Sequence, residues 1–456
     1  MKLILLSGGS GKRLWPLSND ARSKQFLKVL GGENNNLESM VQRVWSQLKE
    51  IAVQQDTFIA TSKSQVDMMT NQLAGEARLI IEPSRRDTFP AIALAATYLK
   101  TVENVSLDEV VAVLPVDPFV EANFFERILD LEKAILSTNA NIGLVGVEPT
   151  YPSEKYGYIV PREKNKQVLD VERFTEKPSE DVAKTLISEG ALWNCGVFAF
   201  KLSYILDLLK EKGFSTDYYG LLVEYERLPK ISFDFEIVEK AEKIVAIPYE
   251  GYWKDLGTWN TLTEEMPVTQ IGKSKVCEES VGTHVINELD IPVTVLDIKD
   301  AIVAVSSDGI LVSSKEKSPK IKEYVESYDD RPMYEERRWG WYRVLDYVRF
   351  EEGNEVLTKR IGVNAGENLS YQYHHERSEV WTIVKGEGVF AFNGELRMVR
   401  PGDVLQITVG DQHGIMAITD LEFIEVQTGT QLIEEDIVRL YMTWDEVESH
   451  CTPIQI

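Results

Sequence analysis

Short β-branched runs alternate with longer amphipathic stretches through the first half of this 456-residue chain. The runs cover residues 2–6, 57–61, 79–82, 110–114 and 142–147, and helical patterns between them cover residues 37–48 and 90–101. This alternation predicts an α/β domain with a mostly parallel sheet and helices on both faces. Ligands of such sheets bind at the carboxyl ends of the strands, so polar residues just after these runs are the first candidates for a site.

The second half of the chain has a different pattern. Brief β-rich pieces separated by turn residues at 281–314 predict a small all-β connector, and the charged segment 315–338 predicts a linker. Short strands with frequent turn signals at 356–426 predict a sandwich or a barrel. We therefore expect a first domain at 1–265, a β-rich connector and linker at 266–337, and an all-β domain at 338–456.

Composition excludes several classes of protein. The net charge of −24 argues against nucleic-acid binding and anionic-membrane binding, because both require a basic face. The 3 cysteines are far apart and lack metal-site spacing, which is typical of a reducing compartment. No apolar run approaches the roughly 18 residues of a membrane span, and no signal peptide is apparent. We expect a cytoplasmic protein.

A glycine-rich turn, LSGGSGKRLWP, overlaps the end of the first β-branched run. Gly8, Gly9 and Gly11 allow backbone amides to approach phosphate closely, and Arg13 and Lys24 supply positive charge. The spacing matches neither GxxxxGK[ST] nor GxGxxG, which argues against a P-loop ATPase and a dinucleotide site. The turn therefore favours binding of a nucleotide polyphosphate, and the alternative is an ordinary turn between a strand and a helix.

Two carboxylates follow the pattern expected for a cation site. Asp117 comes just after the run at 110–114, and Asp255 lies in the segment YWKDLGTW. Two carboxylates on one ligand-binding rim are able to hold Mg²⁺ against phosphate, because this cation prefers hard oxygen ligands. The alternative for each residue is a turn or a helix cap.

Two further segments carry groups suited to a sugar phosphate. In FTEKPS, Glu176 offers an acceptor for hydroxyls and Lys177 a cation for phosphate, although a solvated ion pair also explains them. In WNCGVF, Asn194 offers a donor and an acceptor, and a buried turn explains this segment equally well.

Eight motifs occur in one order: LSGGSGKRLWPLS, SKQFL, EPSRRDTFPAIALAA, LPVDP, YGYI, FTEKP, WNCGVF and WKDLGTW. Together they resemble the sugar-1-phosphate nucleotidyltransferases and, within them, the mannose-1-phosphate guanylyltransferases. The resemblance runs from Met1 to about Thr261 and is weaker through the connector. It implies a Rossmann-like domain that converts GTP and mannose-1-phosphate into GDP-mannose and pyrophosphate, as activated mannose for surface polysaccharide or glycans.

The same resemblance implies three groups of site residues. The nucleotide group is Gly8, Gly9, Gly11, Arg13, Lys24, Arg86 and Asp87. The hexose phosphate group is Gly157, Glu176, Lys177 and Asn194. The magnesium group is Asp117 and Asp255, and the catalytic set is Arg13, Lys24, Asp117, Lys177 and Asp255. The chain departs from the usual family pattern at Lys12, Asp87 and Pro118, which lie beside the expected nucleotide site and bear on the choice of base and hexose.

Three of the 5 histidines lie within the predicted sandwich or barrel: His374, His375 and His413. Gln372 and His374 are two residues apart on a predicted strand and so share a face, and Glu379 follows after a short turn. Imidazole, carboxylate and amide oxygen suit Zn²⁺ or another divalent transition metal. The alternative is a set of histidines that fill or line the barrel.

The spacing of glycines around these residues resembles the two cupin motifs, with Gln372, His374, Glu379 and His413 as the implied metal ligands. A cupin joined to this first domain resembles, over the whole chain, the bifunctional mannose-6-phosphate isomerase and mannose-1-phosphate guanylyltransferase family. That family implies a homodimer and isomerisation between mannose-6-phosphate and fructose-6-phosphate. Glu376 and Val380 stand where histidines are usual. Three alternatives therefore stay open: a cupin that serves only regulation or dimerisation, another pair of sugar phosphate and nucleotide, and a sugar-nucleotide binding protein without turnover.

Overall fold

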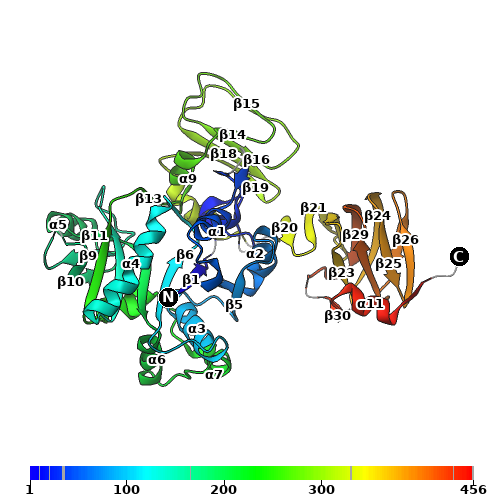
Figure 1. Cartoon of the computed structure of the whole chain (residues 1–456). Coiled ribbons are helices and arrows are strands. Elements are labelled where there is room, and N and C mark those ends of the chain that lie inside the picture. The colour runs from blue at the N-terminus through cyan, green and yellow to red at the C-terminus, as the bar shows by residue number, and fades with distance from the viewer. Residues whose placement is uncertain are drawn as a thin grey trace.

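The computed structural model describes residues 1–9, 11–19, 21–32, 36–164, 166–328, 331–434 and 436–453. Figure 1 shows three lobes: an N-terminal α/β domain, a smaller β lobe above it, and a β domain at the C-terminal end. None of the helices in the described ranges is long and apolar enough to cross a membrane.

A nine-stranded sheet forms the centre of the N-terminal domain, in the order β5-β4-β1-β6-β11-β8-β12-β10-β9. These strands are β1 (Lys2–Ser7), β4 (Thr57–Ser62), β5 (Arg78–Glu82), β6 (Val110–Pro115), β8 (Ile142–Val147), β9 (Tyr158–Pro161), β10 (Leu169–Thr175), β11 (Leu192–Lys201) and β12 (Ile244–Tyr249). Strand β1 runs parallel to β4 and β6, and β8 runs parallel to β12. The predicted α/β class is therefore confirmed.

The sheet is mixed: two of its nine strands, β10 and β11, run opposite to the other seven, so the prediction of a mostly parallel sheet is confirmed. Strand β11 runs antiparallel to both of its central neighbours, β6 and β8. Strands β9 and β10 form an antiparallel pair at the edge, and the short segment between them is too short for a parallel crossover. Alternating runs in the sequence show where strands lie but not in which direction they run.

Helices cover both faces of this sheet, as predicted. They are α1 (Met40–Glu50), α2 (Val66–Gln72), α3 (Thr88–Thr101), α4 (Asn123–Thr138), α5 (Glu180–Ser188), α6 (Leu202–Glu211), α7 (Tyr218–Glu224) and α8 (Phe233–Glu236). A further helix, α9 (Trp259–Glu265), packs against the connector instead. Leu3 and Leu5 of β1 contribute to one buried core, and Ile4 contributes to the core on the other side. This division follows from the alternation of side chains along a strand.

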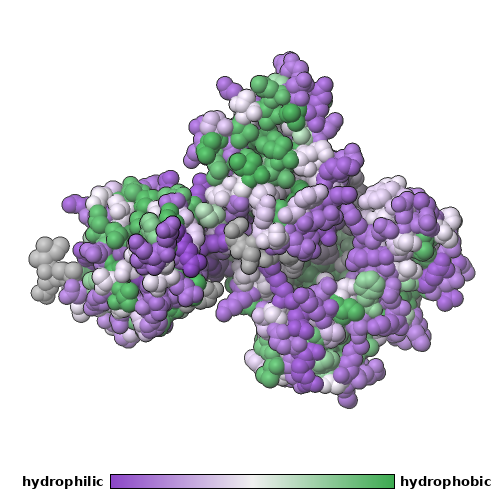
Figure 2. All heavy atoms as spheres, turned by 180° about the vertical axis from the view of Figure 1, so that it is seen from behind, coloured by the Kyte–Doolittle hydropathy of each residue, from purple (hydrophilic) through white to green (hydrophobic). Residues whose placement is uncertain are grey.

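The connector winds as a short solenoid. Its strands are β14 (Gln270–Ile271), β15 (Ser274–Val276), β16 (His284–Asn287), β17 (Val293–Val295), β18 (Ala301–Ser306) and β19 (Gly309–Ser314). Strands β14, β16 and β18 pair in parallel, as do β15 and β17, and β19 closes the larger sheet in antiparallel fashion. Apolar side chains gather on this lobe in Figure 2, and several are exposed, among them Leu296, Ile310 and Val312. The all-β expectation is confirmed, while the parallel pairing of these strands was not predicted.

Two six-stranded sheets pack together in the C-terminal domain, which confirms the all-β expectation. The strands are β20 (Tyr334–Arg337), β21 (Gly340–Arg349), β22 (Glu355–Val363), β23 (Asn368–Tyr373), β24 (Arg377–Lys385), β25 (Gly388–Phe392), β26 (Glu395–Val399), β27 (Val404–Ile407), β28 (His413–Ala417), β29 (Leu421–Gly429), β30 (Val438–Tyr441) and β31 (Thr452–Pro453). The domain also contains α11 (Trp444–His450), and the helix α10 (Ile321–Val325) precedes it. Residues 315–338 were predicted to be a linker, but strand β20 lies within them. Its residues are extended because they pair with β21 as a hairpin.

Ser39 determines where the first helix begins. Its hydroxyl accepts a hydrogen bond from the Gln42 amide, and the Gln42 side chain accepts one from the Ser39 amide, which forms a capping box. The Ser39 hydroxyl also donates to Gln72 Oε1 at 2.6 Å inside the core. We predict that Ser39→Ala lowers the free energy of unfolding by about 1 to 3 kcal/mol in denaturant titrations, because a cap and a buried partner are lost together.

The matched control is Ser188→Ala at the exposed end of α5. This control is expected to change the free energy of unfolding by less than about 0.5 kcal/mol. Equal effects of the two substitutions would contradict the role assigned to Ser39.

Candidate functional site

A pocket of about 230 Å³ brings together five of the predicted site residues from five separate segments: Asp117, Gly157, Glu176, Asn194 and Asp255. Asp117 follows β6, and Asp255 ends the short strand β13 (Trp253–Asp255). Strand β13 pairs with β7 (Pro118–Val120), with Asp255 opposite Pro118. This pairing places the two carboxylates on neighbouring segments at one rim of the pocket.

Lys24 occupies the space between these two carboxylates. Its Nζ lies 2.6 Å from Asp117 Oδ2 and 3.5 Å from Asp255 Oδ1. Burial alone would lower the pKa of Lys24, but the two carboxylates outweigh burial and raise the pKa above its ordinary value. Lys24 therefore remains charged, and the three side chains form a compact centre with hard oxygen donors for a divalent cation.

The glycine-rich turn leaves its backbone accessible. A Cβ added to Gly8 or Gly9 would meet nothing within 4 Å, and Gly9 has a φ of +114°. Gly11 differs, because a Cβ there would come within 2.9 Å of the Lys24 backbone nitrogen. The first two glycines thus offer open backbone, while Gly11 allows the Lys24 segment to pack closely. Arg13 is exposed in the short 3₁₀ turn η1 (Lys12–Leu14).

A buried polar network fixes the glycine turn against the Lys24 segment. The Ser23 hydroxyl donates to the carbonyl oxygen of Gly9 at 3.0 Å, and Gln65 Nε2 donates to the Ser23 hydroxyl at 2.6 Å. Gln25 Nε2 donates to the hydroxyl of Ser7 at 3.1 Å. A buried network with each member paired fixes a unique local conformation, so it holds the loop in one place.

Arg86 and Asp87 already have partners within the protein. Arg86 Nη1 lies 2.6 Å from Glu226 Oε2, and Arg86 Nη2 donates to the carbonyl oxygen of Leu228 at 2.8 Å. Asp87 has a φ of +74°, and its carboxylate accepts from the Thr88 amide at 2.7 Å at the start of α3. These contacts give both residues a structural role, and their predicted contact with base and ribose stays a prediction.

The other end of the pocket is built around Gly157. A Cβ at this position would lie 2.5 Å from Phe174 Cζ and 2.6 Å from Glu176 Oε2, so glycine is required. Glu176 Oε1 lies 2.7 Å from Lys177 Nζ, and Lys177 is about half exposed. The predicted acceptor and cation therefore stand side by side, one buried and one facing solvent.

Asp234, in α8, belongs to this pocket and was not predicted. Its Oδ1 accepts a hydrogen bond from Asn194 Nδ2 at 2.9 Å, and the residue lines the pocket with Glu176. Burial, with a smaller contribution from the charge of Glu176, raises the pKa of Asp234 to about 7. In the sequence, Asp234 comes two residues after Ser232 and lies in the first turn of a helix, so it is indistinguishable there from an ordinary helix-start acid.

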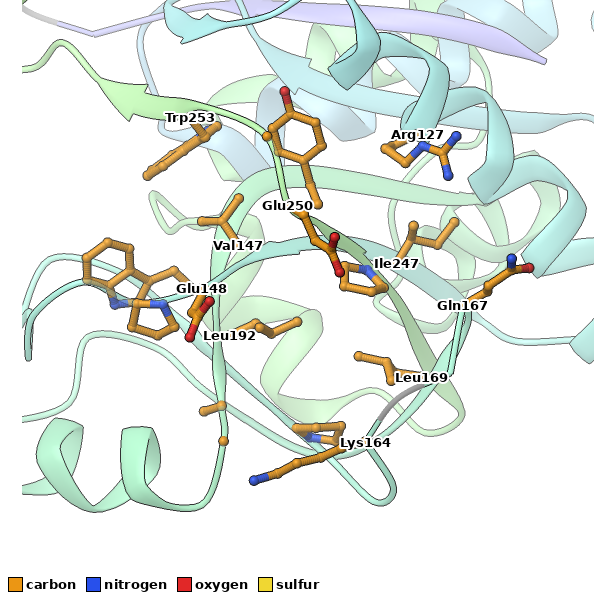
Figure 3. Close-up of a pocket in the computed structure, with 18 of the residues that line it drawn as sticks. Arg127, Val147, Glu148, Lys164, Gln167, Leu169, Leu192, Ile247, Glu250 and Trp253 are labelled. Carbon is orange, nitrogen blue, oxygen red and sulfur yellow. The ribbon is translucent and has the colours of Figure 1, made fainter.

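A larger hollow of about 1320 Å³ lies on the far side of Trp253, which lines both spaces. Figure 3 shows an apolar floor that includes Val147, Leu192 and Ile247, with Glu148 and Glu250 beside it. None of the predicted site residues lines this hollow.

The second predicted site forms inside the C-terminal domain. His374, Glu379 and His413 are buried, and their ligand atoms all lie within 4.8 Å of one another. Gln372 is also buried and stands opposite His413 across the pair β23 and β28. His375 is exposed and does not belong to the cluster.

Both imidazoles are oriented for ligation. His374 Nδ1 lies 2.5 Å from the carbonyl oxygen of Asp436, and His413 Nδ1 lies 3.0 Å from that of Asp411. Hydrogen bonds to these carbonyls assign the proton to Nδ1 and leave Nε2 as the acceptor atom that faces the cluster. His374 Nε2 lies 3.3 Å from Glu379 Oε1 and 3.5 Å from Arg377 Nη2. His413 Nε2 is buried and makes no hydrogen bond to the described residues. Burial also lowers the pKa of His374 to about 4, which keeps the ring neutral at physiological pH.

Several polar side chains around this cluster were not predicted from the sequence. Arg377 Nε donates to Glu379 Oε1 at 2.8 Å. Glu425, on β29, accepts from Trp381 Nε1 at 3.1 Å and is also buried. Burial and the nearby charge of Glu379 raise the pKa of Glu425 to about 8. Their signal in the sequence was only the alternation of polar and apolar residues along the two strands.

Two family profiles match this chain, one in each half. The profile of the nucleotidyl transferase family matches residues 2–270, and the mannose-6-phosphate isomerase C-terminal profile matches residues 328–442. A Vibrio cholerae protein named "Putative mannose-1-phosphate guanylyltransferase" is 30% identical, over 96% of this chain and 98% of its own. The mannose-1-phosphate guanylyltransferase ManC of Salmonella typhimurium is 29% identical, over 96% of each chain.

One solved structure supports the fold of the first two lobes. It comes from Thermus thermophilus and is described as a mannose-1-phosphate geranyltransferase. It is 26% identical, covers 72% of this chain and 99% of its own, and superposes with a TM-score of 0.60. With both profiles matched and one relative aligned over nearly its full length, the chain belongs to the mannose-1-phosphate guanylyltransferase family, whose nucleotidyltransferase domain is here joined to a mannose-6-phosphate isomerase C-terminal domain.

Proposed function

We propose that this enzyme transfers GMP from GTP to mannose-1-phosphate, which yields GDP-mannose and pyrophosphate. The observation that carries the proposal is the Lys24, Asp117 and Asp255 centre, which stands at the rim of a pocket containing Gly157, Glu176 and Asn194. The family supplies the base and the hexose, as in the relatives named above. A cytoplasmic location, expected from the cysteine pattern and the sequence as a whole, and a homodimer, implied by the resemblance alone, are parts of the same proposal.

The reaction requires positioning more than proton transfer. A phosphate oxygen of mannose-1-phosphate attacks the α-phosphorus of GTP, the bond from this phosphorus to the bridging oxygen breaks, and pyrophosphate leaves with that oxygen. Such a step is accelerated by alignment and by neutralisation of charge on the phosphates. Open backbone at Gly8 and Gly9, together with Arg13 and Lys24, supplies these functions on the nucleotide side.

Asp117 and Asp255 are the residues that would hold Mg²⁺. Their fit to this cation follows from their donor atoms, since two carboxylates meet one lysine at the pocket rim. A bound Mg²⁺ supplies further charge neutralisation for the polyphosphate. Lys24 then exchanges a carboxylate partner for phosphate oxygens, which are equally strong acceptors for an ammonium group.

The hexose phosphate is proposed to lie along the Gly157 end of the pocket. Glu176 and Asn194 offer acceptors and a donor to hydroxyl groups, and Gly157 leaves room for a ring close to the backbone. Lys177 stands next to Glu176 and faces solvent, so its charge is available to the sugar phosphate. This arrangement separates recognition of the sugar from the charged centre where bonds change.

For the C-terminal domain we propose a divalent transition metal, Zn²⁺ among the candidates, held by Gln372, His374, Glu379 and His413. Two observations support this set: His413 Nε2 has no hydrogen-bond partner among the described residues, and it lies 3.5 Å from the buried carboxylate of Glu379. The metal would polarise oxygens of an aldose or ketose phosphate, which suits isomerisation of mannose-6-phosphate.

A purely regulatory or dimerising role is the second candidate for this domain. Glu376 and Val380, where the usual histidines are absent, are both exposed. These departures therefore leave the buried cluster intact and alter its surroundings. They bear on isomerisation more than on metal binding.

We predict that Asp117→Asn and Asp255→Asn each lower kcat for pyrophosphate release from GTP and mannose-1-phosphate by about 100-fold or more. The physical reason is the loss of charge that holds the cation against the polyphosphate. Melting temperatures are expected to stay close to that of the wild type, because both side chains lie at the pocket rim. Wild-type turnover in either variant would contradict the proposal, and Asp181→Asn, at a residue 94% exposed, is the matched control.

Asp234 generates a prediction about pH. Its folded pKa of about 7 lies above the reference value of 3.8, so the folded protein binds more protons between these values and loses stability as pH rises through them. Asparagine cannot ionise and still accepts from Asn194. We therefore expect the melting temperature of Asp234→Asn, relative to the wild type, to rise between pH 4 and pH 8. A constant difference across this range would contradict the assigned pKa, and Asp181→Asn again serves as the control.

For the C-terminal domain we predict that the protein purifies with about one divalent transition metal ion per chain by elemental analysis. His374→Ala is expected to remove most of this metal, because one of two imidazole ligands is lost. His375→Ala, at the exposed neighbour, is the matched control and is expected to retain it. Equal metal content in both variants would contradict the proposed ligand set.

A further inference from the structure

The segment that leads to Lys24 rests on the connector and on the first hairpin of the C-terminal domain. Arg22 is two residues before Lys24 and is only 9% exposed. Its Nη1 lies 2.9 Å from both carboxylate oxygens of Glu288, a residue of the connector. An arginine paired with a carboxylate in this way has a restricted position and orientation.

Tyr334 of strand β20 completes the environment of Arg22. The guanidinium carbon of Arg22 lies 5.5 Å from the centre of the Tyr334 ring, and that of Arg343 lies 5.8 Å from the same ring. Arg343 Nη2, on β21, also donates to the carbonyl oxygen of Glu288 at 3.3 Å. One hairpin therefore contacts both members of the ion pair.

A second set of contacts holds the same segment a few residues earlier. Asn19 Oδ1 accepts from the Arg22 amide at 2.7 Å, and Asn19 Nδ2 donates to Asp308 Oδ2 at 2.7 Å. Asp308 Oδ1 in turn accepts from the amide of Met333, one residue before β20. The turn between β18 and β19 thus joins the Lys24 segment to the start of the hairpin.

We propose that Arg22 is a positioning residue for Lys24, and that Glu288 and Tyr334, from the connector and the C-terminal hairpin, are structural parts of the transferase site. Ser23 and Gln65 hold the same segment from the glycine-turn side. Lys24 therefore stands between two supports, one from its own domain and one from outside it. Displacement of a catalytic group by about 1 Å costs about 100-fold in rate, so loss of either support reduces turnover.

The inference rests on the proposed transferase reaction and is tested with Arg22→Lys, Glu288→Gln and Tyr334→Leu in the full chain. We expect kcat for pyrophosphate release to fall by about 10- to 100-fold in each variant, with KM for GTP within about threefold of the wild type. The kcat of the double variant Arg22→Lys/Glu288→Gln is expected to be no lower than that of the less active single variant, because both substitutions break the same contact. Tyr334→Phe keeps the ring and is expected to keep most of the activity.

Arg78→Lys is the matched control. Arg78 lies on the distant edge strand β5, where it pairs with Glu103 and covers the ring of Phe58. Its kcat is expected to equal that of the wild type. Wild-type kcat in Arg22→Lys and Glu288→Gln, or a loss no greater than that of the control, would overturn the inference. Melting curves of each variant separate loss of fold from loss of position. Absence of turnover in the wild-type protein would count against the proposed reaction instead.

Discussion

The ion pair of Lys24 with Asp117, extended to Asp255, is the interaction on which the arrangement of the proposed transferase site depends. Each residue comes from a different part of the chain, and each is brought to the rim by its own local structure. The pairing of β7 with β13 aligns the two acids, and the close approach at Gly11 brings in the lysine. The ammonium group of Lys24 is thereby already held where the proposed reaction needs positive charge.

The contacts of Arg22 extend this dependence beyond the N-terminal domain. A side chain next to the charged centre is paired with the connector and covered by the hairpin that opens the C-terminal domain. Figure 1 shows β20 close to α2, between the N-terminal domain and the rest of the C-terminal domain. Arg337 of β20 lies 3.8 Å from Asp67 of α2, which adds a direct charged contact between the outer domains. The first hairpin of the C-terminal domain thus contacts both the N-terminal domain and the connector, while the two proposed sites lie in separate domains.

Much of this organisation was predictable from sequence, and the exceptions have physical causes. The strands of the first domain were found because β-branched residues mark buried strands, whereas the direction of β11 has no local signature. The convergence of Asp117 and Asp255 followed from resemblance to a family, since residues so far apart in sequence carry no spacing signal. Asp234 and Glu425 were missed because single acids look alike in sequence, and only burial distinguishes them.

The most direct test of this account is pyrophosphate release by the purified protein with Mg²⁺, measured for mannose-1-phosphate and glucose-1-phosphate against GTP, ATP, CTP and UTP. The account predicts strong preference for GTP with mannose-1-phosphate, despite Lys12, Asp87 and Pro118 beside the nucleotide site. Preference for another pair would contradict the assigned substrates while leaving the chemistry in place. Absence of pyrophosphate release with every pair would contradict the transferase activity itself.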